Sequence, residues 1–260
     1  MSLNAFHILG TLQHKHIRAN PKVQEEYKRL REISKVQQQT PDLKDKECLS
    51  ICILNIRSFK KHCLDLSNDK TLSKCDVIAL TQTQLFSNVA NDEMSSVLKV
   101  FFLYRQDHSS DKFLSLAVCY KETITLTETE YFSSINGLKF VISNSDRSFT
   151  CLLLYCKNAA NIQQFLSCLE YIIISCDIDI IFGDFNIDYL NEKNSYLLKQ
   201  LTESLNYFQL VHQPTFVSTG SLLNHLYVKC SLSNHAETKV VSLHYSDHKA
   251  VKVALKFDTI

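Results

Sequence analysis

The sequence predicts an α/β fold built from mixed β-sheets. Short apolar runs rich in β-branched residues recur along the chain, which is typical of buried strands. Fewer segments carry apolar residues at helical spacing. Between residues 100 and 155 the strand-like runs are joined by segments too short for crossover helices, so we expect those strands to pair antiparallel. With 260 residues the chain can bury one sizeable core, and one main domain is expected.

The N-terminal part of the chain differs in character from the rest. Residues 1–35 are polar and charged, and Pro21 indicates the first turn of a helix that ends near residue 35. Residues 36–47 combine three glutamines with Pro41 and alternating charges, which is typical of a solvated linker. Apolar character begins directly afterwards, so we place the main domain at residues 48–257.

The expected elements of this domain follow from its apolar pattern. The near-continuous run LSICILNI at 49–56 suits a strand buried on both faces. Further strands are expected at residues 77–80, 100–104, 114–120, 139–143, 151–155, 178–182, 222–228 and 250–255. Helices are expected at residues 64–74, 162–175 and 195–205, and Asn161 is a candidate N-cap for the second of them.

Charge and cysteine content exclude several classes of protein. The formal net charge of +1 gives no global argument for a nucleic-acid partner, so such a partner must be argued from the site. The 10 cysteines form no CxxC pair, and no secretory leader opens the chain. We therefore expect an intracellular protein in which the cysteines of apolar runs are packing residues: Cys119, Cys151, Cys156, Cys168 and Cys176. No apolar run approaches the roughly 18 residues that span a bilayer, so no membrane partner is expected.

The strongest local signal for chemistry is the motif GDFN at residues 183–186, directly after a buried run. At the end of a buried strand, Asp184 and Asn186 project together into a cleft, where they can hold a metal ion and a phosphate oxygen. The alternative is that both residues only form a strand-ending turn, because aspartate and asparagine favour turns. The motif alone leaves these two interpretations equally weighted.

Two further polar clusters lie at strand ends. Asp247 and His248 directly precede the last predicted strand, and a carboxylate beside an imidazole suits phosphoester hydrolysis. Asn55 ends the first strand, and Arg57 follows it as a planar donor able to bind phosphate. Three such clusters, separated by long intervals, exceed what turns require.

The order of these clusters resembles the apurinic-type endonuclease domains of non-LTR retrotransposons, within the endonuclease/exonuclease/phosphatase superfamily. The matching motifs, in chain order, are NIRS at 55–58, ALTQT at 79–83, LLLY at 152–155, GDFN, PT at 214–215, SLLNHLYV at 221–228 and SDH at 246–248. The resemblance covers about residues 49 to 256. It implies two packed mixed β-sheets flanked by helices, a four-layer α/β sandwich. It also implies a Mg²⁺-dependent phosphodiesterase site, with Mn²⁺ as a possible substitute, and DNA as the usual substrate.

The resemblance also implies roles for individual residues. Asn55 matches the asparagine that binds metal and phosphate, and Tyr155 matches the tyrosine that contacts phosphate. Asp184 and Asn186 match the catalytic pair, in which the aspartate positions or activates the attacking water. The terminal Asp-His pair falls on two adjacent residues: Asp247 as a metal ligand and His248 as the group that contacts the phosphate.

Two expected carboxylates are replaced by neutral amides. Gln82 stands where the motif ALTET has its metal-binding glutamate, and Asn224 stands where LIDHIF has the aspartate that orients the histidine. Protein-bound Mg²⁺ is held by only one or two carboxylates, so the first change weakens or removes metal binding. Asn224 can accept a hydrogen bond from His248 but supplies no charge to an imidazolium, and its amide hydrogens can favour the wrong tautomer. His225 and Tyr227, in the same motif, are expected to be ordinary core residues.

The segment 4–31 resembles the C-terminal tail of Pif-type DNA helicases, although an unrelated leader helix remains the alternative. No GxxxxGK[ST] loop is present to bind nucleotide phosphates, so ATP hydrolysis is not expected. A helicase tail before an endonuclease domain is similar to the polyproteins of Helitron-like transposons, which implies a helicase module as partner. A nuclear location is expected only if DNA is the substrate. The sequence thus favours a catalytically impaired, transposon-derived DNA endonuclease. The alternatives are a catalytically inactive nucleic-acid-binding remnant and a phosphatase acting on a small phosphoester.

Overall fold

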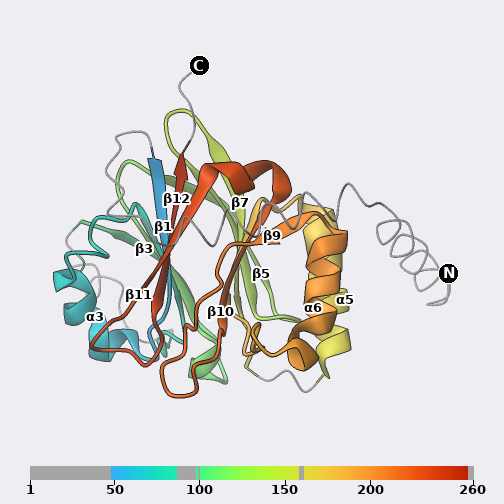
Figure 1. The fold of residues 1–260 in the computed structure, drawn as a ribbon. Coiled ribbons are helices and arrows are strands. Elements are labelled where there is room, and N and C mark those ends of the chain that lie inside the picture. The colour runs from blue at the N-terminus through green and yellow to red at the C-terminus, as the bar shows by residue number, and fades with distance from the viewer. Residues whose placement is uncertain (1–47, 87–97, 99, 158–160, 257–260) are drawn as a thin grey trace.

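Two six-stranded mixed sheets pack face to face in the computed structural model, which describes residues 48–86, 98, 100–157 and 161–256 (Figure 1). The first sheet has the strand order β11-β12-β1-β2-β4-β3 and the second has the order β5-β6-β7-β8-β10-β9. The strands of the first sheet are β1 (Cys48–Asn55), β2 (Val77–Thr81), β3 (Phe102–Gln106), β4 (Leu116–Tyr120), β11 (Ala236–Val241) and β12 (Ala250–Lys256). Those of the second are β5 (Thr125–Phe132), β6 (Gly137–Ser143), β7 (Ser148–Tyr155), β8 (Ile180–Asp184), β9 (Tyr207–Gln209) and β10 (Asn224–Lys229).

Helices cover the outer faces of both sheets, so the predicted four-layer α/β sandwich is confirmed. Helix α3 (Phe59–Asn68) lies on the first sheet, whereas α5 (Ile162–Cys176) and α6 (Glu192–Ser204) lie together on the second (Figure 1). Two short 3₁₀ helices complete the described elements: η1 (Lys112–Leu114) and η3 (Cys230–His235). The predicted N-cap of α5 is present, because the side chain of Asn161 accepts a hydrogen bond from the backbone N–H of Gln164 at 3.1 Å. None of the described helices has the length and apolarity that crossing a lipid bilayer requires.

Strand β1 shows why the first sheet is buried on both faces. Ile51 and Ile53 point into the core between the sheets, while Cys52 and Leu54 pack with the apolar side chains of α3. Because side chains alternate along a strand, a continuous apolar run is needed to fill both layers, as the sequence predicted. The cysteines of the described residues form no disulfide, and Cys119, Cys151 and Cys156 are buried packing residues as expected. Cys168 and Cys176 pack against the core but are only partly buried.

The pairing of the strands is both parallel and antiparallel. Strand β1 pairs parallel with β2 and antiparallel with β12, and β7 pairs parallel with β8 and antiparallel with β6. Antiparallel pairing of the successive strands between residues 100 and 155 is confirmed within each sheet. Between β4 and β5 the chain instead passes from the first sheet to the second. The carboxyl ends of β1 and β2, and of β7 and β8, are therefore the natural place for a site.

Several predicted bounds are wrong. The helix expected at 64–74 begins at Phe59 and ends at Asn68, because Asp69 stops it by accepting hydrogen bonds from the backbone N–H groups of Thr71 and Leu72. The strand expected at 100–104 begins two residues later. Strands β5, β9 and β11 were not predicted. Each is an edge strand of its sheet, and β5 and β11 carry largely polar or exposed residues that give no apolar run. The helix, the linker and the helicase-like stretch expected before residue 48 lie outside the described residues.

Candidate active site

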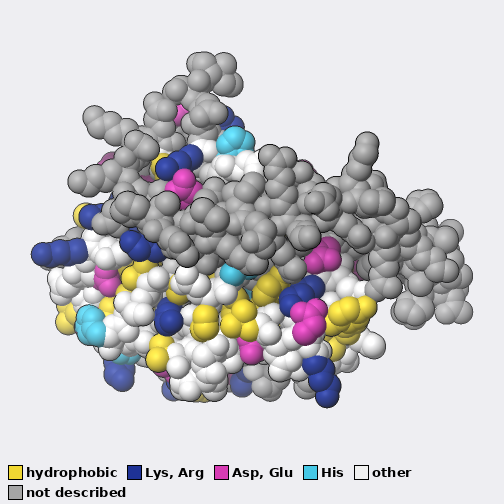
Figure 2. Space-filling view, in the orientation of Figure 1, with side chains coloured by type: hydrophobic (Ala, Val, Ile, Leu, Met, Phe, Trp, Pro, Cys, Tyr) yellow, Lys and Arg dark blue, Asp and Glu magenta, His cyan; other side chains and the backbone are white. Residues whose placement is uncertain are grey.

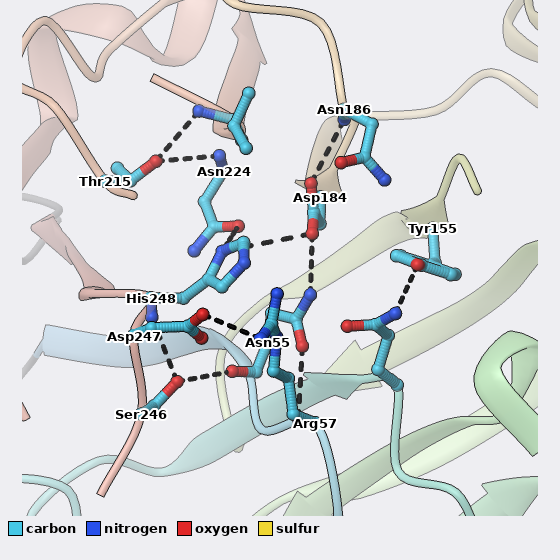
Figure 3. A network of polar contacts seen from close by, with 12 residues as sticks. Asn55, Arg57, Tyr155, Asp184, Asn186, Thr215, Asn224, Ser246, Asp247 and His248 are labelled. Atoms are coloured by element: carbon cyan, nitrogen blue, oxygen red, sulfur yellow. Dashed lines mark hydrogen bonds and ion pairs between the residues drawn. The ribbon is translucent and has the colours of Figure 1, made fainter. Parts of the chain in front are cut away.

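Polar side chains from both sheets meet at one edge of the sandwich (Figure 3). β1 ends at Asn55, β7 ends at Tyr155 and β8 ends at Asp184. Strand β10 runs antiparallel to β8 and begins at Asn224, directly opposite Asp184 in the register. His248 lies just before the start of β12, beside β1. The packing of the two sheets thus brings together residues that are up to 193 positions apart in the sequence, since Asn55 and His248 share this edge.

Asp184 is the buried centre of the site. Its Oδ2 accepts a hydrogen bond from Nδ2 of Asn55 at 2.6 Å and lies 3.9 Å from Nδ1 of His248. Its Oδ1 accepts the backbone N–H of Asn186 at 3.1 Å. Burial raises the pKa of the Asp184 carboxyl to about 6, and the hydrogen bonds from Asn55 and Asn186 lower it in part. A carboxylate that titrates just below neutral pH suits the positioning of an attacking water.

The side chain of Asn224 orients His248. Nδ2 of Asn224 donates to the backbone carbonyl of Lys249 at 3.1 Å, so Oδ1 is the atom that faces Nδ1 of His248, at 3.3 Å. This arrangement places the proton on Nδ1 and leaves Nε2 as the acceptor, so the concern that the amide hydrogens would select the wrong tautomer is not borne out. Burial lowers the pKa of His248 to about 4, with the charge of Asp247 raising it in part. The imidazole is therefore neutral at pH 7.

Gln82 and Tyr155 form the opposite side of the site. The amide Nε2 of Gln82 donates a hydrogen bond to the Tyr155 hydroxyl. Gln82 follows β2 in a left-handed backbone conformation, with φ of 52°. Burial raises the pKa of Tyr155 to about 12, and the nearby charge of Asp184 adds to this, so the phenol stays protonated. Asn186 is held beside them, because its Nδ2 donates to the carbonyl of Cys156.

Asp247 forms an ion pair with Arg57. Nη1 of Arg57 lies 2.8 Å from Oδ2 of Asp247. The backbone N–H of Arg57 donates to Oδ1 of Asn55 at 3.1 Å, and Ser246 Oγ donates to the backbone carbonyl of Asn55 at 2.9 Å. His248 N–H in turn donates to Ser246 Oγ at 3.1 Å. The Ser246-Asp247-His248 segment is thus tied to the end of β1.

The donor set does not fit a firmly held Mg²⁺ or Mn²⁺. Its expected ligands are Asn55, Gln82 and Asp247. Oδ1 of Asn55 already accepts the Arg57 N–H, and Nε2 of Gln82 donates to the Tyr155 hydroxyl, so Gln82 could offer a metal ion only its uncharged Oε1. The remaining carboxylate, Asp247, is neutralised by the Arg57 guanidinium. No three His, Cys, Asp or Glu side chains of the described residues gather where they could share an ion. Mg²⁺ in proteins relies on one or two carboxylates, and the only expected one here already has a cation.

All nine residues singled out in the sequence lie at this edge, but two positioning residues carried no predicted role. Thr215 Oγ1 accepts the backbone N–H groups of Leu223 and Asn224, both at 2.9 Å, and so fixes the start of β10. Phe216 packs its ring 4.8 Å from that of His248. The PT motif at 214–215 was the only signal for this segment, and it gave no residue-level role.

His225 is a core residue, as expected. It is fully buried, its ring stacks on Phe185 at 4.6 Å, and Nδ1 lies 3.0 Å from the Tyr227 hydroxyl. Nε2 lies 2.8 Å from the carbonyl of Ile187 and 3.0 Å from that of Leu222. These contacts support the GDFN segment from behind and do not reach the site.

No protein-family profile matches the sequence, and no characterised protein matches it in sequence. Solved structures do match in fold. The endonuclease domain of TRAS1, a telomere-specific non-LTR retrotransposon, has 11% identity and a TM-score of 0.62, with 80% of this chain and 98% of that chain covered. The AP endonuclease LMAP of Leishmania major has 13% identity and a TM-score of 0.70, with 85% and 92% covered. An endonuclease/exonuclease/phosphatase family protein of Leptotrichia buccalis has 12% identity and a TM-score of 0.60, with 80% and 100% covered. The fold is therefore that of the endonuclease/exonuclease/phosphatase proteins.

Proposed function

We propose that this chain is a DNA endonuclease-type phosphodiesterase domain whose hydrolytic step is impaired. One observation carries the proposal: the site retains Asp184 hydrogen-bonded to Asn55 and 3.9 Å from His248, while amides stand at both supporting positions, Gln82 and Asn224. The retained groups can bind a phosphodiester and position a water. The amides supply no negative charge, either for a metal ion or for an imidazolium.

The protonation state of His248 gives a physical reason for the proposed impairment of phosphodiester hydrolysis. A His248 imidazole with a pKa near 4 is uncharged at neutral pH, and with its proton on Nδ1 it has none on Nε2 to donate to the phosphate. An aspartate at position 224 would favour the imidazolium by direct charge, as opposite charges within about 4–6 Å do. Asn224 keeps the hydrogen bond and the ring orientation but removes that charge. The site is therefore geometrically preserved and electrostatically weakened.

DNA as the ligand and a transposon origin complete the proposal. They are supported by the motif series from NIRS to SDH and by the fold shared with a retrotransposon endonuclease domain. The formal net charge of +1 gives no independent support. Over the described part of the face in Figure 2, basic side chains are interspersed with acidic and apolar ones. The helicase-like stretch adds a helicase module of a parent polyprotein as a proposed partner. The nucleus is the proposed location because DNA is the proposed substrate.

A supercoiled-plasmid nicking assay in Mg²⁺ and in Mn²⁺ tests the proposal. We expect the wild-type chain to leave the plasmid intact, or to nick it far more slowly than the double variant Gln82→Glu, Asn224→Asp. The control adds Asp184→Ala to that double variant and should abolish nicking. Equal nicking by wild type and double variant would contradict the impairment. A double variant that binds DNA but never cuts would favour the second candidate, an inactive nucleic-acid-binding remnant.

A further inference from the structure

The guanidinium of Arg57 lies against the carboxylate that a metal ion would need. Nη1 is 2.8 Å from Oδ2 of Asp247, and Oδ1 of Asp247 is buried with no hydrogen-bond partner among the described residues. An ion that approached this acid would meet the fixed positive charge of Arg57 beside it. Arg57 thus already supplies the positive charge beside Asp247 that a divalent metal ion would provide.

Besides the ion pair with Asp247, two contacts hold the arginine in this position. Its backbone has φ of 55°, a left-handed conformation, and its N–H donates to Oδ1 of Asn55 at 3.1 Å. The guanidinium carbon lies 5.9 Å from the ring centroid of Phe216, whose ring packs against His248. The side chain is 53% exposed, so part of the guanidinium faces the solvent. A guanidinium has five N–H donors in a planar fork that matches the oxygens of a phosphate.

The neutral side chain at position 82 limits the negative charge that an anionic ligand would meet in the site. Arg57 balances Asp247, which leaves the buried carboxylate of Asp184, and Gln82 adds no charge while its Nε2 donates to the Tyr155 hydroxyl. A glutamate at position 82 would add a third carboxylate and would require a metal ion to offset it. The neutral Gln82 and the Arg57–Asp247 ion pair therefore both reduce the need for a metal ion in the site.

We propose that the Arg57 guanidinium takes the place of the divalent cation, so that the site binds a nucleic-acid phosphodiester without any metal ion. The ligand class rests on the proposed function above. Arg57 binds the non-bridging phosphate oxygens. Asp247 and Phe216 fix the orientation of its guanidinium, and the Asn55 side chain accepts its backbone N–H. Metal independence is a separate claim, because an impaired endonuclease could still bind its substrate through Mg²⁺.

Fluorescence anisotropy with a fluorescein-labelled 20-base-pair DNA duplex tests this claim. We expect the wild-type chain to bind equally, within about twofold, in EDTA and in Mg²⁺. Arg57→Gln should weaken binding in EDTA by about tenfold or more, as the loss of a charged phosphate contact does. Arg147→Gln is the charge-matched control, since Arg147 lies in the turn before β7, at the opposite end of that strand from Tyr155, and it should change binding less than about twofold. Binding that disappears in EDTA and returns with Mg²⁺ would overturn the inference and leave the proposed function standing.

Direct Mn²⁺ binding, followed by electron paramagnetic resonance, separates the two proposals without any DNA. We expect wild-type protein to leave Mn²⁺ free and Arg57→Gln, which releases the Asp247 carboxylate, to bind it. Gln82→Glu combined with Arg57→Gln should bind it more tightly still. Wild-type protein that binds Mn²⁺ as tightly as these variants would refute the inference. A chain that binds no DNA in either buffer would instead refute the proposed function, while this measurement still decides the metal. Circular dichroism melting confirms that each variant is folded.

Discussion

Two histidines of this molecule, His225 and His248, lie 23 residues apart in the sequence. Both are buried and both have a lowered pKa, yet their neighbours give them different roles. Burial lowers the pKa of both His225 and His248 to about 4. His225 is enclosed by backbone carbonyls, a tyrosine hydroxyl and the ring of Phe185, and among the described residues no charged side chain forms a hydrogen bond or ion pair with it. His248 contacts the amide of Asn224 and approaches the carboxylate of Asp184. A depressed pKa therefore identifies a buried histidine, and only the partners identify a functional one.

Removal of His248 should have the largest effect on activity. In the double variant Gln82→Glu, Asn224→Asp, we expect His248→Ala to reduce nicking by about 10²- to 10⁴-fold, the usual contribution of a positioned acid or base. Its thermal melting should change little. Initial rates of plasmid nicking measure this effect. A His225→Phe change in the same background is the matched control, and an equal loss of cleavage there would break the distinction between the two histidines.

Removal of His225 should have the largest effect on stability. We expect His225→Ala to lower the free energy of unfolding by about 2–4 kcal/mol, because it leaves a cavity against Phe185 and deprives two buried backbone carbonyls of a donor. His248→Ala, at the edge of the core, should cost about 1 kcal/mol. Urea unfolding at pH 7 measures both. The comparison fails if His248→Ala proves to be the more destabilising change.

His225 should contribute to the pH dependence of the free energy of unfolding. Its folded pKa of about 4 lies below the value of 6.5 for an exposed histidine, so the unfolded state binds more protons between these values. Stability from this residue is therefore full above pH 6.5, falls as the pH falls toward 4 and is constant below. We expect His225→Phe to remove about 2 kcal/mol of the stability difference between pH 7 and pH 5. Urea unfolding at the two pH values measures it, and an unchanged difference would show that folding does not lower the pKa of His225.

The smallest expected effect is on titration itself. Asn224→Asp places a carboxylate against Nδ1 of His248, so we expect the pKa of His248 to rise by about one to two units. The pKa of His225, which is adjacent in sequence but faces the core, should not change. Histidine ring signals followed by nuclear magnetic resonance against pH report both values in one experiment. Equal movement of the two pKa values would indicate a general change in burial instead of a local charge.

Local patterns in the sequence were sufficient for much of the fold. The apolar run of β1 requires burial on both faces, and Asn161 caps α5 through a contact three residues away. These features depend on neighbouring residues alone. The edge strands β5 and β11 could not be predicted in this way, because their residues are largely polar or exposed and only the pairing partner defines the strand. Strand β9 is buried, but its three residues are too few to form a strand-like pattern.

The site divides in the same manner. The motif order alone identified Asn55, Asp184, His248 and the two substituted positions, because residues at strand ends come together whenever the sheets pack as this fold requires. Only the tertiary structure decided what each side chain contacts: Asn224 turns its oxygen to His248 because Lys249 takes its amide, and Arg57 reaches Asp247 from 190 residues away. Such partners depend on the packing of distant segments and on the few hydrogen bonds that each geometry permits, and a linear pattern contains neither.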